Sequence, residues 1–561
     1  MLDYREKTVP QTSENATVAH QHTDHWTMFP PVLKALLCTL LLLCALPALA
    51  GHGVDLASNS IQLALTTEPP NLNSLTATDS VSFFVLAHTQ EGLLTYNEQG
   101  ELTSGVAKDW HMEGTTVRFT LRDNASWCDG KPITAQDFVF AWRTALKAST
   151  ASRYAFILYP IRNAQKVHEE KLPLDALGVY AEDEKHLRVE LEQATAYFPS
   201  LTTFATYYPL REDFYNAHSK NYAADADKLL CNGAFRLTHW IHGASLVLEK
   251  NPNYWDAERV KLQRITIPHI TNDTGTLLNL FQAGDIAFTE LSRDTLPLAL
   301  EQRLYLQSFN KGMLHYMEFN FRPQRLLHNA NLRKAISWVM DRNTLVNKVI
   351  ASPGTKATAQ FFPDWLPGIT PQHTAPEPNI AAAQQALDQA KKELRIVEFP
   401  PLTLLIYDSP AVVRQAEYLQ RMLQESLGIT LVIDKQIFKQ KLAKLNSGDF
   451  DLALSAWGPD YNDPMTFADL LHSANANNHG RYKNLHYDAL VERAAALPAS
   501  TERNQLFQQM DTIIQQDIAV LPLSEPGILY VLDKRLHNVR RSRFGDDPDF
   551  RHAWIAQDGK H

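Results

Sequence analysis

Leu402-Thr-Leu-Leu-Ile-Tyr407 opens the stretch of sequence that decides the fold, and Phe450-Asp-Leu-Ala-Leu-Ser-Ala-Trp457 closes it. Both are apolar runs of strand length. Between them lie two amphipathic segments, at 411–427 and 437–446, and a third apolar run at 429–433. The order is strand, helix, strand, helix, strand. It predicts an α/β fold with a mostly parallel sheet and right-handed crossovers.

The segment beyond the last of these strands is the candidate binding site. It reads Trp457-Gly-Pro-Asp-Tyr-Asn-Asp-Pro464 and holds two acids and two aromatic side chains. In parallel sheets, ligands bind just beyond the carboxyl ends of the strands. Within the strand itself, the alternation predicts one face that carries Phe450, Leu452, Leu454 and Ala456.

Shorter patterns extend this organisation to both sides. Thr134 and Asp137 form a capping-box pattern ahead of a helix. A further helix is predicted at 331–340, and Asp341 is expected to cap the next one. Alternating apolar residues predict strands at 61–65 and 116–122, and a hairpin across 233–249.

Size and charge narrow the class of protein. The chain has 561 residues, of which 45% are apolar and 20% charged, and its formal net charge is −9. This composition is typical of a globular protein, and roughly 150 residues per domain predicts three to four domains. An acidic chain lacks the basic face that nucleic acids require, so we expect no nucleic-acid partner.

The N-terminal region has the pattern of a secretory signal. A short apolar run at 36–46 follows a basic residue and precedes a small-x-small motif that ends at Ala50. The run is shorter than the roughly 20 apolar residues of a membrane-spanning helix. Residues 1–50 are therefore interpreted as an N-terminal extension and a signal peptide cleaved after Ala50, with Met28 as the start of translation. A permanent anchor and lipoprotein processing at Cys44 are the alternatives.

Two cysteines, Cys128 and Cys231, remain in the mature chain. An oxidising compartment permits a disulfide between them, and the sequence leaves open whether it forms. The sequence contains no Cys-x-x-Cys pair, complete phosphate loop, zinc-protease helix or Gly-x-Ser-x-Gly elbow. We therefore expect a protein that is not an enzyme and holds no metal or cofactor, although active sites also assemble from residues far apart in sequence.

A series of motifs occurs in order across nearly all of 60–545. The motifs are Gly105-Val106-Ala107-x-x-Trp110, Phe119-x-Leu121-Arg122, Trp127-x-Asp129-Gly130-x-Pro132-x-Thr134-Ala135-x-Asp137, Asn232-Gly233-Ala234-Phe235, Asn251-Pro252-x-x-Trp255, Arg333-Lys-Ala-Ile, Asp341-Arg342 and Trp457-x-x-Asp460-Tyr461. The series resembles that of the family 5 extracellular solute-binding proteins, and most of all their oligopeptide-binding branch.

The resemblance implies a fold of the periplasmic-binding-protein type II kind. Two lobes close on a ligand by hinge motion, and an extra domain is inserted in the first. It further implies a periplasmic monomer that captures short peptides and delivers them to an inner-membrane ABC transporter permease. The boundaries carried over are 51–80, 205–312 and 527–561 for lobe one, 81–204 for the inserted domain and 313–526 for lobe two.

The resemblance also implies how a peptide would bind. In this family the peptide lies extended between strand segments of the two lobes, so its backbone supplies affinity and side-chain pockets supply specificity. The matching segments here carry Glu68 and Asn71 in lobe one, and Ala456 to Gly458 in lobe two.

Asp460 stands where the family places the acid that receives the peptide's α-amino group. A charge-assisted bond of this kind contributes about 1.5–3 kcal/mol. The alternative is that Asp460 caps the turn before Asn462. Trp457 and Tyr461 are predicted to line side-chain pockets, with plain interdomain packing as the alternative for Trp457.

The sequence also departs from the family. Some members have a cysteine where Gly458 stands, and its partner position here is Met313. The basic residues that meet the peptide's carboxylate are replaced by Leu454, Leu445 and Asn446, so recognition of that end must differ or be absent. Murein peptides, dipeptides or a metal chelate are the alternative ligands, and a sensor or chaperone module is the alternative class.

Overall fold

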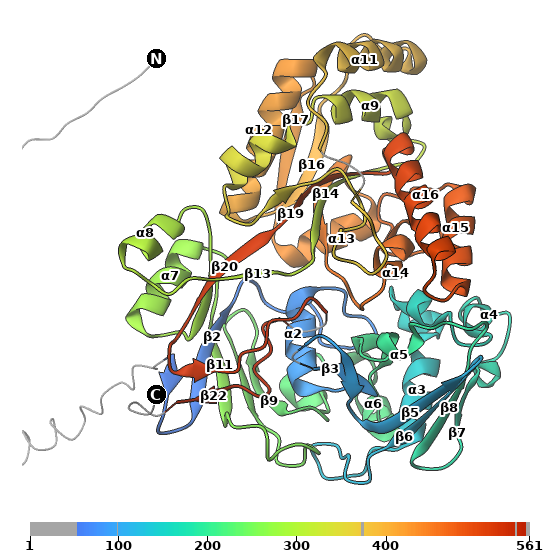
Figure 1. Ribbon diagram of the computed structural model, residues 1–561, viewed down its shortest axis with the longest axis vertical. Coiled ribbons are helices and arrows are strands. Elements are labelled where there is room, and N and C mark those ends of the chain that lie inside the picture. Colours follow the sequence, from blue (N-terminus) through green and yellow to red (C-terminus); the bar gives the residue numbers. More distant parts are fainter. Residues whose placement is uncertain (1–52, 98, 372–374, 545–546, 557–561) are drawn as a thin grey trace, which may run out of the picture. The chain divides into compact units, whose positions relative to one another are not determined.

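The computed structural model describes residues 53–97, 99–371, 375–544 and 547–556 (Figure 1). The predicted signal peptide with its cleavage site, the start at Met28 and Cys44 lie outside these ranges. None of the helices within them combines the length and the apolar character that a membrane crossing needs.

A six-stranded sheet contains the predicted strand-helix-strand-helix-strand unit. Within that unit, β16 lies between β17 and β18 and runs parallel to both, as predicted. The expectation that the whole sheet is mostly parallel is wrong, because its other three pairings are antiparallel. On the other side of β18 the sheet is antiparallel, through β14 and β19 to β15. The strands in spatial order are β15 (Lys356–Ala357), β19 (Val520–Glu525), β14 (Leu314–Phe319), β18 (Leu452–Trp457), β16 (Leu402–Tyr407) and β17 (Leu431–Gln436).

Helices cover both faces of this sheet. The crossover helix α12 (Pro410–Leu427) starts after Ser409, whose side chain accepts from the Val412 N–H, and ends at Gly428 with a left-handed φ of 67°. It packs on one face with α9 (Ala330–Trp338) and α11 (Ile380–Leu394). The second crossover helix, α13 (Phe438–Ser447), packs on the opposite face through Leu445.

Two details of the predicted strands are wrong. The strand predicted at 429–433 runs instead over 431–436, and the one predicted at 450–457 begins at 452. Phe450 therefore does not share a face with Leu452 and Leu454: it packs with Leu405, Leu445 and Ala453 on the other side of the sheet. The chain bends at Asp451, just before the strand starts, and the Asp451 carboxylate accepts the Thr403 N–H at 2.8 Å.

A second, five-stranded sheet holds the predicted strand near 61–65 and the predicted hairpin. The hairpin turns at Gly243, where φ is 71°. Two helices follow the sheet in the chain, α7 (Thr274–Ala283) and α8 (Leu296–Glu301). The strands in spatial order are β1 (Val54–Asp55), β2 (Ser60–Leu65), β11 (Arg264–Ile270), β10 (Ser245–Lys250) and β9 (Phe235–Ile241).

A third region, built around residues 80–208, has its own sheet and shares a hydrophobic core with the rest of the described chain. The predicted capping box is present at the start of α3 (Ala135–Ala145), because the Asp137 carboxylate accepts the Thr134 N–H at 2.9 Å. The other helices are α2 (Ser80–Thr89), α4 (Ala164–His168) and α5 (Phe198–Leu201). The strands are the pair β3 (Leu94–Tyr96) and β4 (Leu102–Ser104), and the sheet β5 (Ala107–Glu113), β6 (Thr116–Leu121), β8 (His186–Glu190) and β7 (Val179–Ala181).

Two short connections join a three-stranded sheet to the six-stranded one. The chain passes from β13 to β14 at 311–313, and from β19 to β20 at residue 526, where the two connections run side by side (Figure 1). The described residues thus form an α/β fold of two lobes. The three-stranded sheet is β12 (Phe288–Leu291), β20 (Gly527–Leu532) and β13 (Gln307–Asn310).

The remaining elements are short or lie near the C-terminal end. Asp341 caps the next helix as predicted, since its side chain accepts the Thr344 N–H at 2.8 Å. These elements are α6 (Glu212–His218), α10 (Arg342–Thr344) with a π-helical turn (Leu345–Ile350), α14 (Met465–Ala468), α15 (Leu485–Ala496), α16 (Thr501–Asp517), β21 (Leu536–His537) and β22 (Trp554–Ile555).

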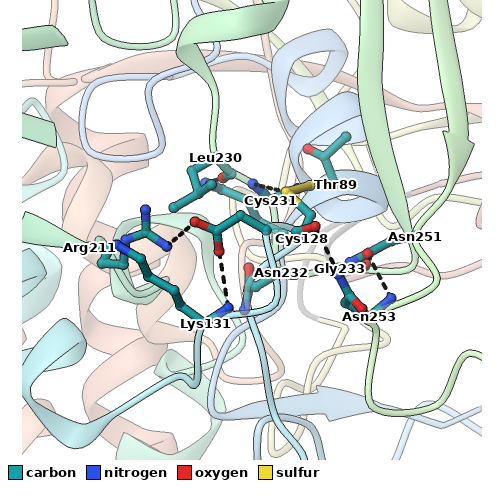
Figure 2. The surroundings of a disulfide bond; sticks show 12 residues. Thr89, Cys128, Lys131, Arg211, Leu230, Cys231, Asn232, Gly233, Asn251 and Asn253 are labelled. Atoms are coloured by element: carbon teal, nitrogen blue, oxygen red, sulfur yellow. Dashed lines mark hydrogen bonds and ion pairs between the residues drawn. A yellow bond between two sulfur atoms is a disulfide. The ribbon is translucent and has the colours of Figure 1, made fainter. Parts of the chain in front are cut away.

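Cys128 and Cys231 form a disulfide, which answers the question that the sequence left open. Their Cα atoms are 5.4 Å apart, and Cys128 N–H donates to the Cys231 carbonyl at 2.8 Å. The Asn253 amide donates to the Cys128 carbonyl at 2.9 Å, so the bridge lies within a network of backbone contacts (Figure 2).

Candidate functional site

The carboxyl end of β18 has an edge that its neighbour leaves uncovered. β16 pairs with β18 only at Leu452 and Ala453, whereas β14 pairs with it from Leu452 to Trp457 on the other side. Among the described residues, no strand pairs with the β16-facing edge of Leu454 to Trp457. An uncovered strand edge offers backbone donors and acceptors to an added strand.

Asp460 follows this edge and is partly buried. Its side chain does not cap the turn: the Asp460 N–H donates to Thr466 Oγ1 at 2.9 Å, and the Asn462 N–H donates to the Tyr96 hydroxyl at 3.3 Å. The capping alternative is therefore wrong for this structure.

The only side chain in the described residues that hydrogen-bonds the Asp460 carboxylate is Tyr154, whose hydroxyl donates to it over 3.4 Å. Desolvation raises the pKa of Asp460 well above its usual range; the Tyr154 bond lowers it, and the nearby Asp469 charge raises it further. A desolvated carboxylate without a cation is costly to ionise, so it favours a ligand that supplies positive charge.

Two tyrosines from the region around 80–208 stack on the aromatic side chains of the segment that carries this acid. Tyr154 stacks on Trp457 with ring centroids 6.3 Å apart and planes at 29°. Tyr197 stacks on Tyr461 at 5.8 Å and 4°. Trp457 is partly buried and donates its indole N–H to the Thr466 carbonyl at 2.8 Å.

Tyr461 is only 2% exposed, and its hydroxyl donates to Asp469 at 3.3 Å. In this structure Tyr461 packs between the two regions rather than presenting its ring to solvent. That it lines a ligand pocket stays a prediction.

Gly458 and Ala456 present mainly backbone. Ala456 is exposed. A β-carbon built on Gly458 would meet Met313 Cγ at 3.5 Å, an ordinary contact. The two positions are therefore neighbours, as the sequence comparison within the family implies, although neither carries a cysteine.

Glu68 and Asn71 lie on the lobe-one side. Glu68 Oε1 is 2.7 Å from His242 Nδ1, and Asn71 donates its amide to Thr76 Oγ1 at 2.6 Å. No described contact joins either residue to 456–461.

The lobe-one segment is linked to the six-stranded sheet at Thr66. Its carbonyl accepts from the Tyr407 hydroxyl at the end of β16, over 3.1 Å. The segment before Glu68 thus lies beside the end of β16, the strand that stops pairing with β18 after Ala453.

A buried ion pair fixes the loop that carries the site. Asp463 accepts two hydrogen bonds from Arg503 on α16, at 2.7 and 2.8 Å, and both side chains are almost fully buried. Sequence reasoning missed Arg503, Tyr154 and Tyr197 because they come from distant parts of the chain and carry no motif.

The lobes, the uncovered strand edge and the desolvated acid define a two-lobed α/β protein built to bind a ligand. The model of the protein family described as "Bacterial extracellular solute-binding proteins, family 5 Middle" matches residues 101–479. The chain belongs to this family.

Relatives of known name span most of the chain. It is 31% identical over 494 residues to the oligopeptide-binding protein OppA of Bacillus subtilis, covering 86% of this chain and 90% of that protein. It is 31% identical over 466 residues to the periplasmic murein peptide-binding protein MppA of Escherichia coli, covering 81% and 86%. The solved structure of Listeria monocytogenes OppA bound to peptide superimposes with a TM-score of 0.83 at 28% identity, covering 89% of this chain and 99% of that one.

Proposed function

We propose that this protein binds short peptides in the periplasm and delivers them to the permease of an ABC transporter. Asp460 carries the proposal: it is a desolvated carboxylate with no cation in the described residues, at the end of an uncovered strand edge. A peptide offers both an ammonium group for the acid and a backbone for the edge.

The names of the relatives support the same ligand class. OppA of Bacillus subtilis is named for oligopeptides, and a Listeria relative was solved with a peptide bound. The role is one of binding without catalysis. The protein acts as a monomer after removal of residues 1–50, and its lobe boundaries are those carried over from the family resemblance.

Murein peptides are the second candidate. MppA, named for them, is as similar in identity as the Bacillus relative. Native mass spectrometry of protein purified from cells, followed by release and sequencing of what is bound, separates the candidates. Mixed sequences support general peptide uptake, and a single murein-derived compound supports the second candidate.

The amine role of Asp460 is tested with Asp460→Asn and two mixed tripeptide libraries, one with free and one with acetylated N-termini. We expect the variant to lose about a hundredfold or more in affinity for the free library, because a buried ammonium is left without its partner. Acetylated peptides have no such charge and should lose far less.

The matched control is Asp388→Asn, which removes the same charge from an exposed position on α11. It should leave both affinities unchanged. Equal losses for the two libraries in Asp460→Asn would refute the amine role.

A further inference from the structure

Lys441 on α13 is a buried cation with no role in the binding site proposed above. Its side chain is 8% exposed. Of its three N–H donors, one bond is formed: Nζ donates to the Leu454 carbonyl at 2.7 Å. Among the described residues, no carboxylate lies within ion-pairing distance of it.

The groups around Lys441 leave its charge largely uncompensated. Burial lowers the pKa of Lys441 to about 8, and the field of Glu318 opposes this shift. Glu318 itself faces His479, with Oε1 and Nδ1 3.6 Å apart. Burial, followed by the charge of Lys441, lowers the pKa of His315 to about 4, so that ring is neutral. At neutral pH the lysine is charged, and two of its three N–H donors have no hydrogen-bond partner among the described residues.

The position of the ammonium is informative. Leu454 is the first residue of the β18 stretch that β16 leaves uncovered. Asp460 lies beyond the other end of the same stretch. The edge on which a peptide would add therefore has an acid beyond one end and a buried cation at the other.

The spacing between the two ends sets a length. With its ammonium at Asp460, a peptide on this edge must run antiparallel to β18, so its carboxyl end points toward Leu454. From Gly458 to Leu454 the strand rises about 13 Å, at about 3.3 Å per residue, which is the span of three to four extended residues.

We propose that Lys441 receives the terminal carboxylate of a bound peptide of three to four residues. The inference rests on the proposed function, and it names the end group and the length of the ligand. Lys441 reaches this place from the middle of α13, and it stands at none of the positions where the family resemblance led us to look for a basic residue.

The test compares a mixed tripeptide library with free carboxyl ends and the same library with amidated ends. Affinities are measured for the wild type, Lys441→Met and Lys439→Met. Lys439 lies on the same helix but is exposed, so its loss controls for net charge. The readout is the ratio of the two affinities within each protein, which does not depend on the fraction of folded protein.

For the wild type we expect free acids to bind about tenfold to a hundredfold more tightly than amides, as for a charge-assisted hydrogen bond. Lys441→Met should bring this ratio close to one, while Lys439→Met should preserve it. The preference should fade for libraries of six residues, whose carboxyl ends pass beyond Leu454.

Two results would overturn the inference alone: a wild type that binds acids and amides equally, or a ratio that Lys441→Met leaves unchanged. A wild type that binds neither library would overturn the proposed function and this inference with it. A purely structural lysine would lower the melting temperature and leave the ratio as it was.

Discussion

Asp469 shows, at the scale of one residue, what burial near the site does to an acid. Desolvation raises its pKa to about 7, although its bond from Tyr461 lowers it. Asp463 nearby raises it further and has Arg503 as its own partner. Asp469 is therefore protonated over much of the acidic range.

A raised pKa in the folded state has a defined sign for stability. The folded protein binds the proton more tightly than the unfolded chain, so stability falls as pH rises through the interval from about 4 to about 7. Asp469→Asn removes this term and keeps the acceptor for Tyr461. We expect the variant to gain in melting temperature over the wild type at pH 8, and to gain little at pH 4.

Thermal unfolding of both proteins at a series of pH values measures the effect. The slope is at most about 1.4 kcal/mol per pH unit for a single group. A difference between the proteins that stays constant from pH 4 to pH 8 would contradict the assignment.

At the scale of elements, the ion pair between α16 and the loop after β18 holds the site in place. Arg503 is 5% and Asp463 11% exposed at the side chain. Replacing Arg503 by Met would leave Asp463 buried without its cation. We expect a loss of about 3–5 kcal/mol in the free energy of unfolding, and weaker peptide binding because Asp460 lies on the same loop.

The double variant Arg503→Met with Asp463→Asn separates charge from packing. Asp463 accepts the Met465 N–H at 2.9 Å, and the amide oxygen introduced by Asp463→Asn would still accept it. The double variant should therefore recover much of the stability. A double variant as unstable as the single one would show that the stranded charge is not the cause.

The elements themselves differed in how far the sequence could predict them. Strand β16 and helix α12 were predicted almost to the residue, because an apolar run defines the strand, and an amphipathic run with a terminal Gly defines the helix. Phe450 was placed on the wrong face because alternation alone does not reveal the bend at Asp451.

The residues of the candidate site also differ in how far the sequence could predict them. Asp460 and the β18 segment could be named from one short motif, because they are contiguous in sequence. The contact of Tyr154 with Asp460 spans 306 positions, and the bond of Lys441 to Leu454 depends on where a helix crosses a sheet. Neither leaves a local pattern, so only the folded chain could show them.

At the scale of the whole molecule, the three-stranded sheet combines strands from two distant parts of the chain. The six-stranded sheet uses only residues 314–525, and the three-stranded sheet uses residues on both sides of that range. We propose that the two connections between these sheets form the hinge about which the lobes close. One contains Gly312, with φ at 70°, where a β-carbon would meet the Trp365 ring at 2.5 Å, so this connection accepts no larger residue without moving that ring.

The disulfide acts at the same scale, because Cys128 and Cys231 are separated by 103 positions. One lies between β6 and α3, the other just before β9, so the bond ties the region around 80–208 to the five-stranded sheet. In the chain-entropy description, a loop of this length contributes about 4–5 kcal/mol by restricting the unfolded state. Cys128→Ser with Cys231→Ser should therefore fold but melt at a lower temperature. Reductant should lower the melting temperature of the wild type and leave the double variant unaffected. Peptide affinity should survive in both proteins, because Asp460 lies elsewhere.

The prediction fails if reduction of the wild type to two free thiols leaves its melting temperature unchanged. That result would show that the disulfide does not provide this stability.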